Sequence, residues 1–248
     1  MNFFSNTQER DAAVVLLVAA LCLTGLEYFT RPAWLAPQLE FLFGATARQT
    51  FDACCGTKAQ PLGRLTYWAL VNIACYLTLP LLTIRFYLRR PLREFGVRTE
   101  NAWLAWRWYV LMLGVMLPLV WLMSATSGFL ALYPFLRLPP GAPLWPTFLW
   151  WELLYFAQFF ALEFFFRGFL LHGLAPQLGR LSILVMMLPY CMLHFGKPLP
   201  ETLASILAGI VLGHLSLKSG SIWLGAVMHC SVALAMDGMA LWRKGLLF

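Results

Sequence analysis

Apolar residues are concentrated in seven runs of the chain, each close to the length of a membrane-spanning helix. The runs cover residues 11–30, 65–88, 103–133, 145–172, 181–196, 199–217 and 221–242. A spanning helix needs roughly 20 mostly apolar residues, and backbone groups in lipid must bond within their own segment. The runs lack the two-residue alternation of membrane β-barrel strands. The pattern therefore predicts an all-α, polytopic membrane bundle of about seven transmembrane helices, with six and eight as alternative counts.

The segment between the first two runs differs from them in its charge. Residues 34–55 are apolar in patches but include Glu40, Arg48 and Asp52. Charges of this number are costly in a lipid-facing span, so the segment is predicted to be amphipathic and to lie in the membrane interface. The first run is not followed by a clear small-residue cleavage site, and we expect a retained helix rather than a signal peptide.

The widest break in the apolar pattern is a basic loop at residues 89–98. It predicts a division between residues 1–100, which hold the amino-terminal helices, the interfacial segment and this loop, and residues 101–248, the core bundle. The positive-inside rule places such a loop in the cytoplasm. This predicts a multi-pass protein of the inner (plasma) membrane with a cytoplasmic amino terminus. Arg243 and Lys244 oppose that orientation, because with seven spans the carboxy terminus that carries these positive charges lies outside.

Composition narrows the function classes further. Hydrophobic residues make up 60% of the 248 residues and charged residues only 12%, against roughly a quarter charged in an ordinary soluble domain. The net charge of +7 is spread between apolar runs, so the sequence predicts contact with the lipid bilayer and no nucleic-acid partner. The six cysteines include no CxxC pair, which indicates neither a zinc knuckle nor a disulfide framework.

Three ionisable residues lie inside the run at 145–172: Glu152, Glu163 and Arg167. Each costs on the order of 2.5–3.5 kcal/mol to place in a membrane, which makes such residues functional candidates. Glu163 and Arg167 are four residues apart, so they share a helix face and can pair. A purely structural ion pair between helices is the alternative interpretation.

Two histidines in other runs reach a similar depth. At about 1.5 Å per residue, Glu163 lies roughly 14 Å, His194 roughly 20 Å and His229 roughly 12 Å from the membrane face where residue 172 lies. His172 and His214 fall near that face itself. We therefore expect Glu163, His194 and His229 to converge in one water-accessible cavity. Such a set can activate water, and it could also hold a zinc ion, although the chain has no HExxH motif.

The residues around these positions resemble the CPBP family of intramembrane endopeptidases, which includes glutamate-type CAAX proteases and bacteriocin-processing enzymes. The similarity rests on Glu163-Phe-Phe-Phe-Arg167-Gly168, on Tyr190 four residues before His194, and on Gly209-Ile-Val-Leu-Gly213 leading to His229. The resemblance implies catalytic roles for Glu163, His194 and His229, with no metal or other cofactor.

Further positions add supporting roles and two departures from the family pattern. Arg167 is predicted to orient Glu163, and Tyr190 and Asp237 complete the supporting set; Asp237 is expected to meet Lys197 or to cap its helix. The family motifs EExxxR and HxxxN are incomplete, because Leu162 replaces the first Glu, the residue that normally activates water, and Ala233 replaces Asn.

The leading interpretation is an intramembrane endopeptidase that cuts a peptide bond in or near the membrane, in a membrane-associated protein or peptide such as one with a carboxy-terminal sorting tail. In the mechanism that the resemblance implies, Glu163, helped by His194, deprotonates a water while His229 donates to the oxyanion. A catalytically silent membrane scaffold or chaperone is the alternative, which Leu162 and Ala233 favour. A small transporter is a third, but the chain lacks paired halves with broken helices.

Overall fold

The computed structural model describes residues 6–56, 58–100, 102–139 and 141–247, and these residues form helices and connecting loops with no strand among them. Six helical segments are long and apolar enough to cross a membrane, which confirms the predicted helical polytopic bundle. They are α1 (Thr7–Phe29), α4 with η1 (Pro61–Leu82 and Thr83–Leu88), α5 (Trp106–Met123), α7 with η4 and α8 (Thr147–Glu163, Phe164–His172 and Gly173–Leu178), α10 (Leu199–Ser219) and α11 (Trp223–Arg243).

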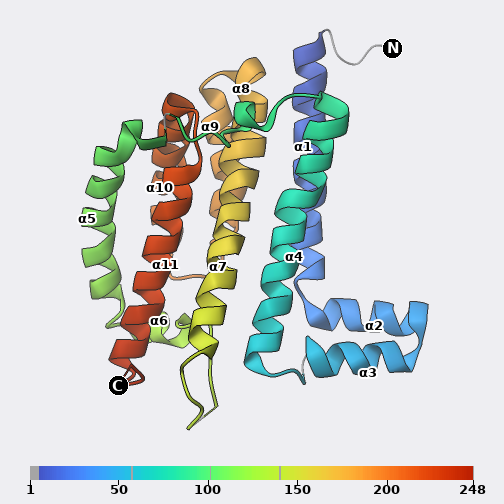
Figure 1. Ribbon diagram of the computed structural model, residues 1–248, viewed down its shortest axis with the longest axis vertical. Helices are drawn as coiled ribbons and strands as arrows, with labels where there is room; N and C mark the ends of the chain where they lie inside the picture. The colour runs from blue at the N-terminus through green and yellow to red at the C-terminus, as the bar shows by residue number, and fades with distance from the viewer. Residues whose placement is uncertain (1–5, 57, 101, 140, 248) are drawn as a thin grey trace.

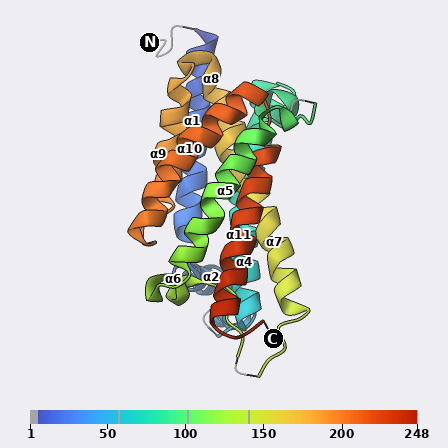
Figure 2. The same cartoon turned by 90° about the vertical axis from the view of Figure 1, so that its left-hand side faces the viewer.

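The seventh predicted run forms the shorter helix α9 (Leu181–Met192). It packs against α10 as the first arm of a hairpin. The helix ends early because Pro189 in its last turn lacks a backbone donor, and the chain then turns at Gly196, which has a positive φ of 87°, before Pro198 precedes α10. The turn of this hairpin lies part-way along the bundle and not at its far end (Figure 2).

Helices α2 (Pro32–Phe43) and α3 (Ala45–Cys54) form the segment that the sequence predicted to lie in the interface. Both lie across the long axis of the bundle, beside the end where α1 finishes and α4 begins (Figure 1). The aromatic ring of Phe41 is 87% exposed and its neighbour Phe43 is 71% exposed. A pair of helices with exposed aromatic residues at this position suits the membrane–water boundary.

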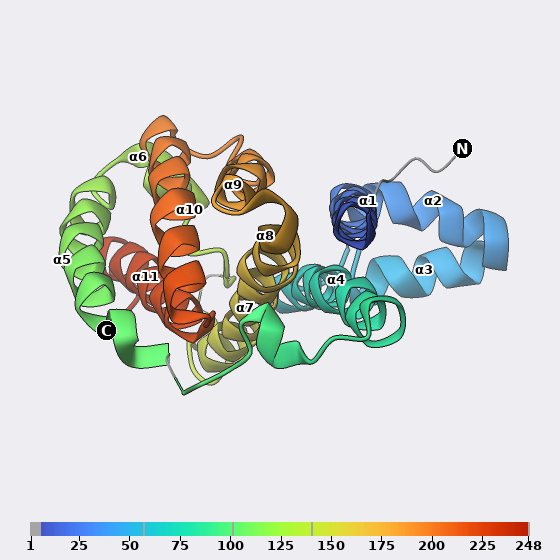
Figure 3. The same ribbon diagram turned by 90° about the horizontal axis from the view of Figure 1, so that it is seen from above.

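Seen along the bundle axis, α5, α9, α10, α7 and α11 surround the interior of the carboxy-terminal half (Figure 3). Helices α1 and α4 lie outside this group, on the side of α7 and α8, and α4 packs against α7. Short helices fill the connections: η2 (Leu92–Phe95) and η3 (Ala102–Ala105) precede α5, and α6 (Ser127–Leu132) follows it.

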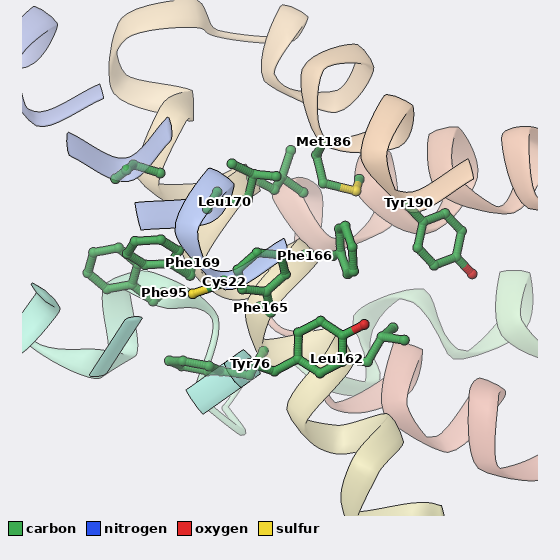
Figure 4. Close-up of a cluster of buried hydrophobic side chains, with 14 of the residues drawn as sticks. Cys22, Tyr76, Phe95, Leu162, Phe165, Phe166, Phe169, Leu170, Met186 and Tyr190 are labelled. Atoms are coloured by element: carbon green, nitrogen blue, oxygen red, sulfur yellow. The ribbon is translucent and has the colours of Figure 1, made fainter. Parts of the chain in front are cut away.

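A buried aromatic cluster joins α1 and α4 to η4 (Phe164–His172), the π-helical continuation of α7 (Figure 4). The Tyr76 ring lies 5.2 Å from the ring of Phe165, and Phe166 contacts Tyr190 of α9 at 5.4 Å. In a membrane, such packing stabilises helix association by close contact, because lipid tails are as apolar as the side chains. The cluster thereby fixes η4, which carries Arg167.

Candidate active site

Glu163 is the last residue of α7 and is completely buried. Its Oε1 atom lies 3.0 Å from Nη1 of Arg167 and 2.8 Å from Nδ1 of His229. Arg167 is also fully buried and stands four residues later in the π-helical segment, so the two charges lie side by side as their spacing predicts. A π-helix of this kind is uncommon and occurs frequently at functional sites.

Gly225 on α11 makes room for the Glu163 carboxylate. A Cβ atom at this position would overlap Oε2 of Glu163 and come within 3.0 Å of its Cδ. The absence of a side chain lets α11 approach α7 closely enough for His229, one turn later, to reach Oε1. Glu163 Oε2 has no hydrogen-bond partner among the residues that the structure describes.

His229 connects the buried ion pair to Tyr190. Its Nδ1 atom faces Oε1 of Glu163 and lies 3.2 Å from the carbonyl oxygen of Gly225. Its Nε2 atom lies 2.8 Å from the hydroxyl of Tyr190. The guanidinium of Arg167 lies over the Tyr190 ring, with Cζ 4.1 Å from the ring centroid. Arg167, Glu163, His229 and Tyr190 therefore form one continuous chain of polar contacts.

His194 lies in the turn between α9 and α10, two residues after α9 ends. Its Nδ1 atom lies 3.0 Å from the carbonyl oxygen of Tyr190, and the two rings are 5.1 Å apart. A carbonyl oxygen only accepts hydrogen bonds, so Nδ1 carries the proton, and Nε2 of the neutral ring is an acceptor with no hydrogen-bond partner among the residues that the structure describes. The hydroxyl of Thr202 donates to the carbonyl of His194 at 2.8 Å, which holds this turn in place.

Two cavities meet at these side chains. One, of about 220 Å³, lies among α5, α9, α10 and α11, and the other, of about 690 Å³, reaches toward α1 and α4. Both are lined by Tyr190, His194 and His229. Glu163 lines neither cavity and stands behind His229. The structure thus brings His194, His229 and Tyr190 to a common cavity wall and places Glu163 and Arg167 beneath it.

Asp237 does not join this group. Its Oδ2 atom accepts a hydrogen bond of 3.1 Å from Nε1 of Trp151, and it is completely buried. The expected contact with Lys197 is wrong: the Lys197 ammonium lies 2.5 Å from Oε1 of Glu201 and 3.3 Å from the hydroxyl of Tyr133. Lys197 lies in the turn before α10 and pairs with Glu201 of the first turn of that helix, whereas Asp237 lies on α11 beside Trp151 of α7.

The two remaining histidines lie outside both cavities. His172 has Nε2 3.1 Å from Oγ of Ser216, and His214 is exposed. Within the described part of the chain, no group of three or more His, Cys, Asp or Glu side chains is placed to hold a metal ion. Glu163, His194 and His229 thus do not form the ligand set that the zinc alternative requires.

Sequence reasoning missed Tyr133, which lines the smaller cavity. Tyr133 lies there with Lys197 and Glu201, and its hydroxyl donates to Glu201 at 3.0 Å. Tyr133 precedes Glu201 by 68 residues. No spacing rule connects positions that far apart, because their contact arises only when the chain folds and the residue that follows α6 meets the first turn of α10.

Comparison with known families bears on the same region. Residues 143–235 match the family model described as Type II CAAX prenyl endopeptidase Rce1-like. This confirms the resemblance to CPBP proteins. The match contains Glu163, Arg167, Tyr190, His194 and His229. No curated protein and no solved structure matches the chain. The chain is therefore a multi-pass membrane protein with an Rce1-like region, and that family is one of proteases.

The two departures from the family motifs both face a cavity. Leu162 lines the larger cavity and Ala233 lines the smaller one. The position that carries the first motif glutamate therefore presents an apolar side chain to the space beside His194 and His229. Glu163 stands at the second glutamate position of that motif, and in this chain it pairs with Arg167.

Proposed function

We propose that this protein is an intramembrane endopeptidase that hydrolyses a peptide bond of a membrane-associated protein or peptide. The observation that carries the proposal is the chain of contacts from Arg167 through Glu163 and His229 to Tyr190, which ends at a cavity wall that His194 also lines. Four polar groups from α7–η4, α9 and α11, together with His194 from the turn after α9, would be costly to gather in a membrane interior without a purpose.

In the proposed reaction His194 is the general base. Its free Nε2 takes a proton from a water molecule in the cavity while the water oxygen bonds to the scissile carbonyl carbon. The C–N bond of the tetrahedral intermediate then breaks, and the proton on Nε2 passes to the leaving amine. Because Glu163 is buried behind His229, this proposal gives the carboxylate an orienting role in place of direct water activation.

Tyr190 and His229 are proposed to stabilise the oxyanion. His229, protonated on both ring nitrogens beside the Glu163 carboxylate, donates through Nε2 to the Tyr190 oxygen, so the Tyr190 hydroxyl proton is left to donate to the developing negative charge. The Arg167 guanidinium on the other side of the Tyr190 ring adds a fixed positive charge nearby. Preorganised donors of this kind take the place of the asparagine that the family motif carries at position 233.

The cavities support a substrate with an extended apolar part. Apolar side chains, five methionines among them, make up most of the wall of the smaller cavity, which lies among membrane helices. A sorting tail or other carboxy-terminal processing segment of a membrane protein fits this chemistry. We propose the inner (plasma) membrane as the location, with the basic loop on its cytoplasmic side.

The direct test is proteolysis by the purified protein in lipid nanodiscs, with membrane-tethered peptides as substrates and mass spectrometry of the products. Wild-type protein is expected to cleave, and Glu163→Gln to lose cleavage because His229 loses its carboxylate partner. Equal cleavage by both would remove the proposed site. The variant's fold is checked by its thermal-unfolding profile.

A second candidate function is a catalytically silent membrane scaffold or chaperone, and one observation favours it. Leu162 and Ala233 both present apolar surfaces to the cavities, at positions where the family motifs carry polar groups. If wild-type protein binds tethered peptides without cleaving them and Leu162→Glu cleaves, the scaffold assignment replaces the endopeptidase. Cleavage by the wild-type protein excludes the scaffold as its sole role.

A further inference from the structure

A third cavity lies at the opposite end of α4 from the interfacial helices. It has a volume of about 770 Å³ and forms where η1 leads into the basic loop. Arg85, Arg89 and Arg90 supply its charge, while Phe86 and Leu92 contribute apolar walls. Of the described residues that line this cavity, none belongs to the candidate active site.

The arginines of this cavity are only partly neutralised. Nε of Arg90 lies 2.7 Å from Oε2 of Glu94. Nε of Arg89 donates to the carbonyl oxygen of Phe86 at 3.3 Å, and Arg85 contacts the Phe86 ring. Among the described residues neither Arg85 nor Arg89 has a carboxylate in ion-pair contact. Three guanidinium groups thus face one carboxylate, which leaves an excess of two positive charges.

The backbone holds one of these arginines in an uncommon conformation. Arg89 has a φ of 53° and ends the π-helical turn of η1, and it is the one non-glycine residue of the described chain with a positive φ. Glycine usually occupies this left-handed position at a helix end, because a Cβ atom there is strained. The chain instead keeps a long cationic side chain at the cavity wall.

The surroundings of the cavity are suited to lipid. Leu82 and Phe86 are 47% and 66% exposed, on the last turns of a membrane-spanning segment, and Leu92 on the other side is 43% exposed. Apolar side chains therefore surround the arginines where the hydrocarbon region of a bilayer meets its headgroups. The positive-inside rule places this end of the bundle at the cytoplasmic leaflet, which carries anionic phospholipids.

We propose that this cavity binds the headgroup of an anionic phospholipid. The phosphate accepts hydrogen bonds from the guanidinium groups of Arg85, Arg89 and Arg90, whose planar donor geometry matches phosphate oxygens. The acyl chains run along Leu82 and Phe86. A soluble phosphate ion lacks this second contact, so the lipid is the better ligand.

The bound lipid would also stabilise the bundle, because the basic loop is tied to the helices of the carboxy-terminal half. The amide of Ile222 donates to the carbonyl of Gly96 at 3.0 Å, and Nε of Arg98 donates to the carbonyl of Gly220 at 3.0 Å. Both contacts lie immediately before α11. A ligand that binds this loop only in its folded form therefore raises the unfolding temperature of the whole protein.

The test uses the full chain in phosphatidylcholine nanodiscs in which an increasing fraction of the lipid is phosphatidylglycerol. The thermal-unfolding midpoint is expected to rise with phosphatidylglycerol and to saturate. In the variant Arg85→Gln/Arg89→Gln/Arg90→Gln the half-saturating fraction should increase about a hundredfold, or about fivefold for each arginine removed. A control with three charges removed at the other end of the bundle, Lys58→Gln/Arg64→Gln/Arg137→Gln, should respond as the wild type does.

Two further experiments test the proposal if the triple variant does not fold. Arg85→Gln alone alters an exposed side chain and should still weaken the response about fivefold. Native mass spectrometry of the wild type should retain phosphatidylglycerol in preference to phosphatidylcholine. An equal response to both lipids, an unchanged response in Arg85→Gln, or an equal stabilisation of the detergent-solubilised protein by inorganic phosphate would overturn the proposal.

Discussion

Leu162 and Glu163 are adjacent in the chain but face different surroundings. Leu162 lines the larger cavity, whereas the carboxylate of Glu163 is completely buried between Arg167 and His229. Successive helical residues point about 100° apart, so only one of the two can face the cavity. In this chain the cavity-facing position is apolar, and the remaining carboxylate contacts His229, which lines the cavity.

His194 should be required for hydrolysis and dispensable for folding. We expect His194→Gln to lower kcat by about 10²- to 10⁴-fold, the usual contribution of a general base, because His229, the other imidazole that lines both cavities, has its Nε2 hydrogen-bonded to the Tyr190 hydroxyl. Peptide cleavage and the unfolding temperature are measured together. The control is His214→Gln, at an exposed histidine outside both cavities, which should cleave at the wild-type rate.

Tyr190→Phe removes one hydroxyl and keeps the ring that covers Arg167. The expected result is a fall in kcat of about 10²- to 10³-fold with little change in KM, because an oxyanion donor acts mainly in the transition state. Tyr155→Phe provides the comparison, since Tyr155 lines the same two cavities. Equal loss in the two variants would show that the Tyr190 hydroxyl has no special role.

Gly225→Ala should disrupt the site by displacing the Glu163 carboxylate. The added methyl group overlaps that carboxylate, and overpacking of this kind typically costs about 1–3 kcal/mol. We expect reduced stability and loss of cleavage. Gly238→Ala on the same helix is the matched control, because a Cβ there meets nothing within 4 Å. A Gly225→Ala protein as stable and active as Gly238→Ala would contradict the packing shown at Glu163.

Arg167→Ala should unfold or fail to accumulate as well as lose activity. Removing one partner of a buried ion pair typically costs about 3–5 kcal/mol, since the other charge is left uncompensated. The measurement is the yield and unfolding temperature of the purified variant. A stable and fully active Arg167→Ala protein would remove Arg167 from the site.

Activity should resist strong metal chelators. The polar groups that face the cavity supply a base and hydrogen-bond donors, and the described residues contain no three-ligand group for a metal. Cleavage is measured before and after chelation and again with added zinc. Loss of cleavage on chelation and its return with zinc would replace the proposed mechanism with a metal-dependent one.

The sequence by itself determined the features that depend on neighbouring residues. Length and hydropathy located the membrane helices, because each span satisfies its own backbone and needs only a local apolar run. The Glu163–Arg167 pair followed from a spacing of four residues. The family motifs marked His194 and His229 as partners of the same site.

Only the tertiary structure decided what these residues contact. The Tyr190–His229 hydrogen bond joins positions 39 residues apart, and the Trp151–Asp237 bond joins positions 86 apart. The rotation of α7 about its axis sets whether Leu162 or Glu163 faces the cavity. That rotation depends on the packing of η4 against α1, α4 and α9, which no single helix encodes. For the same reason the sequence predicted Lys197 as a partner of Asp237, whereas the packing of α7 against α11 places Asp237 beside Trp151.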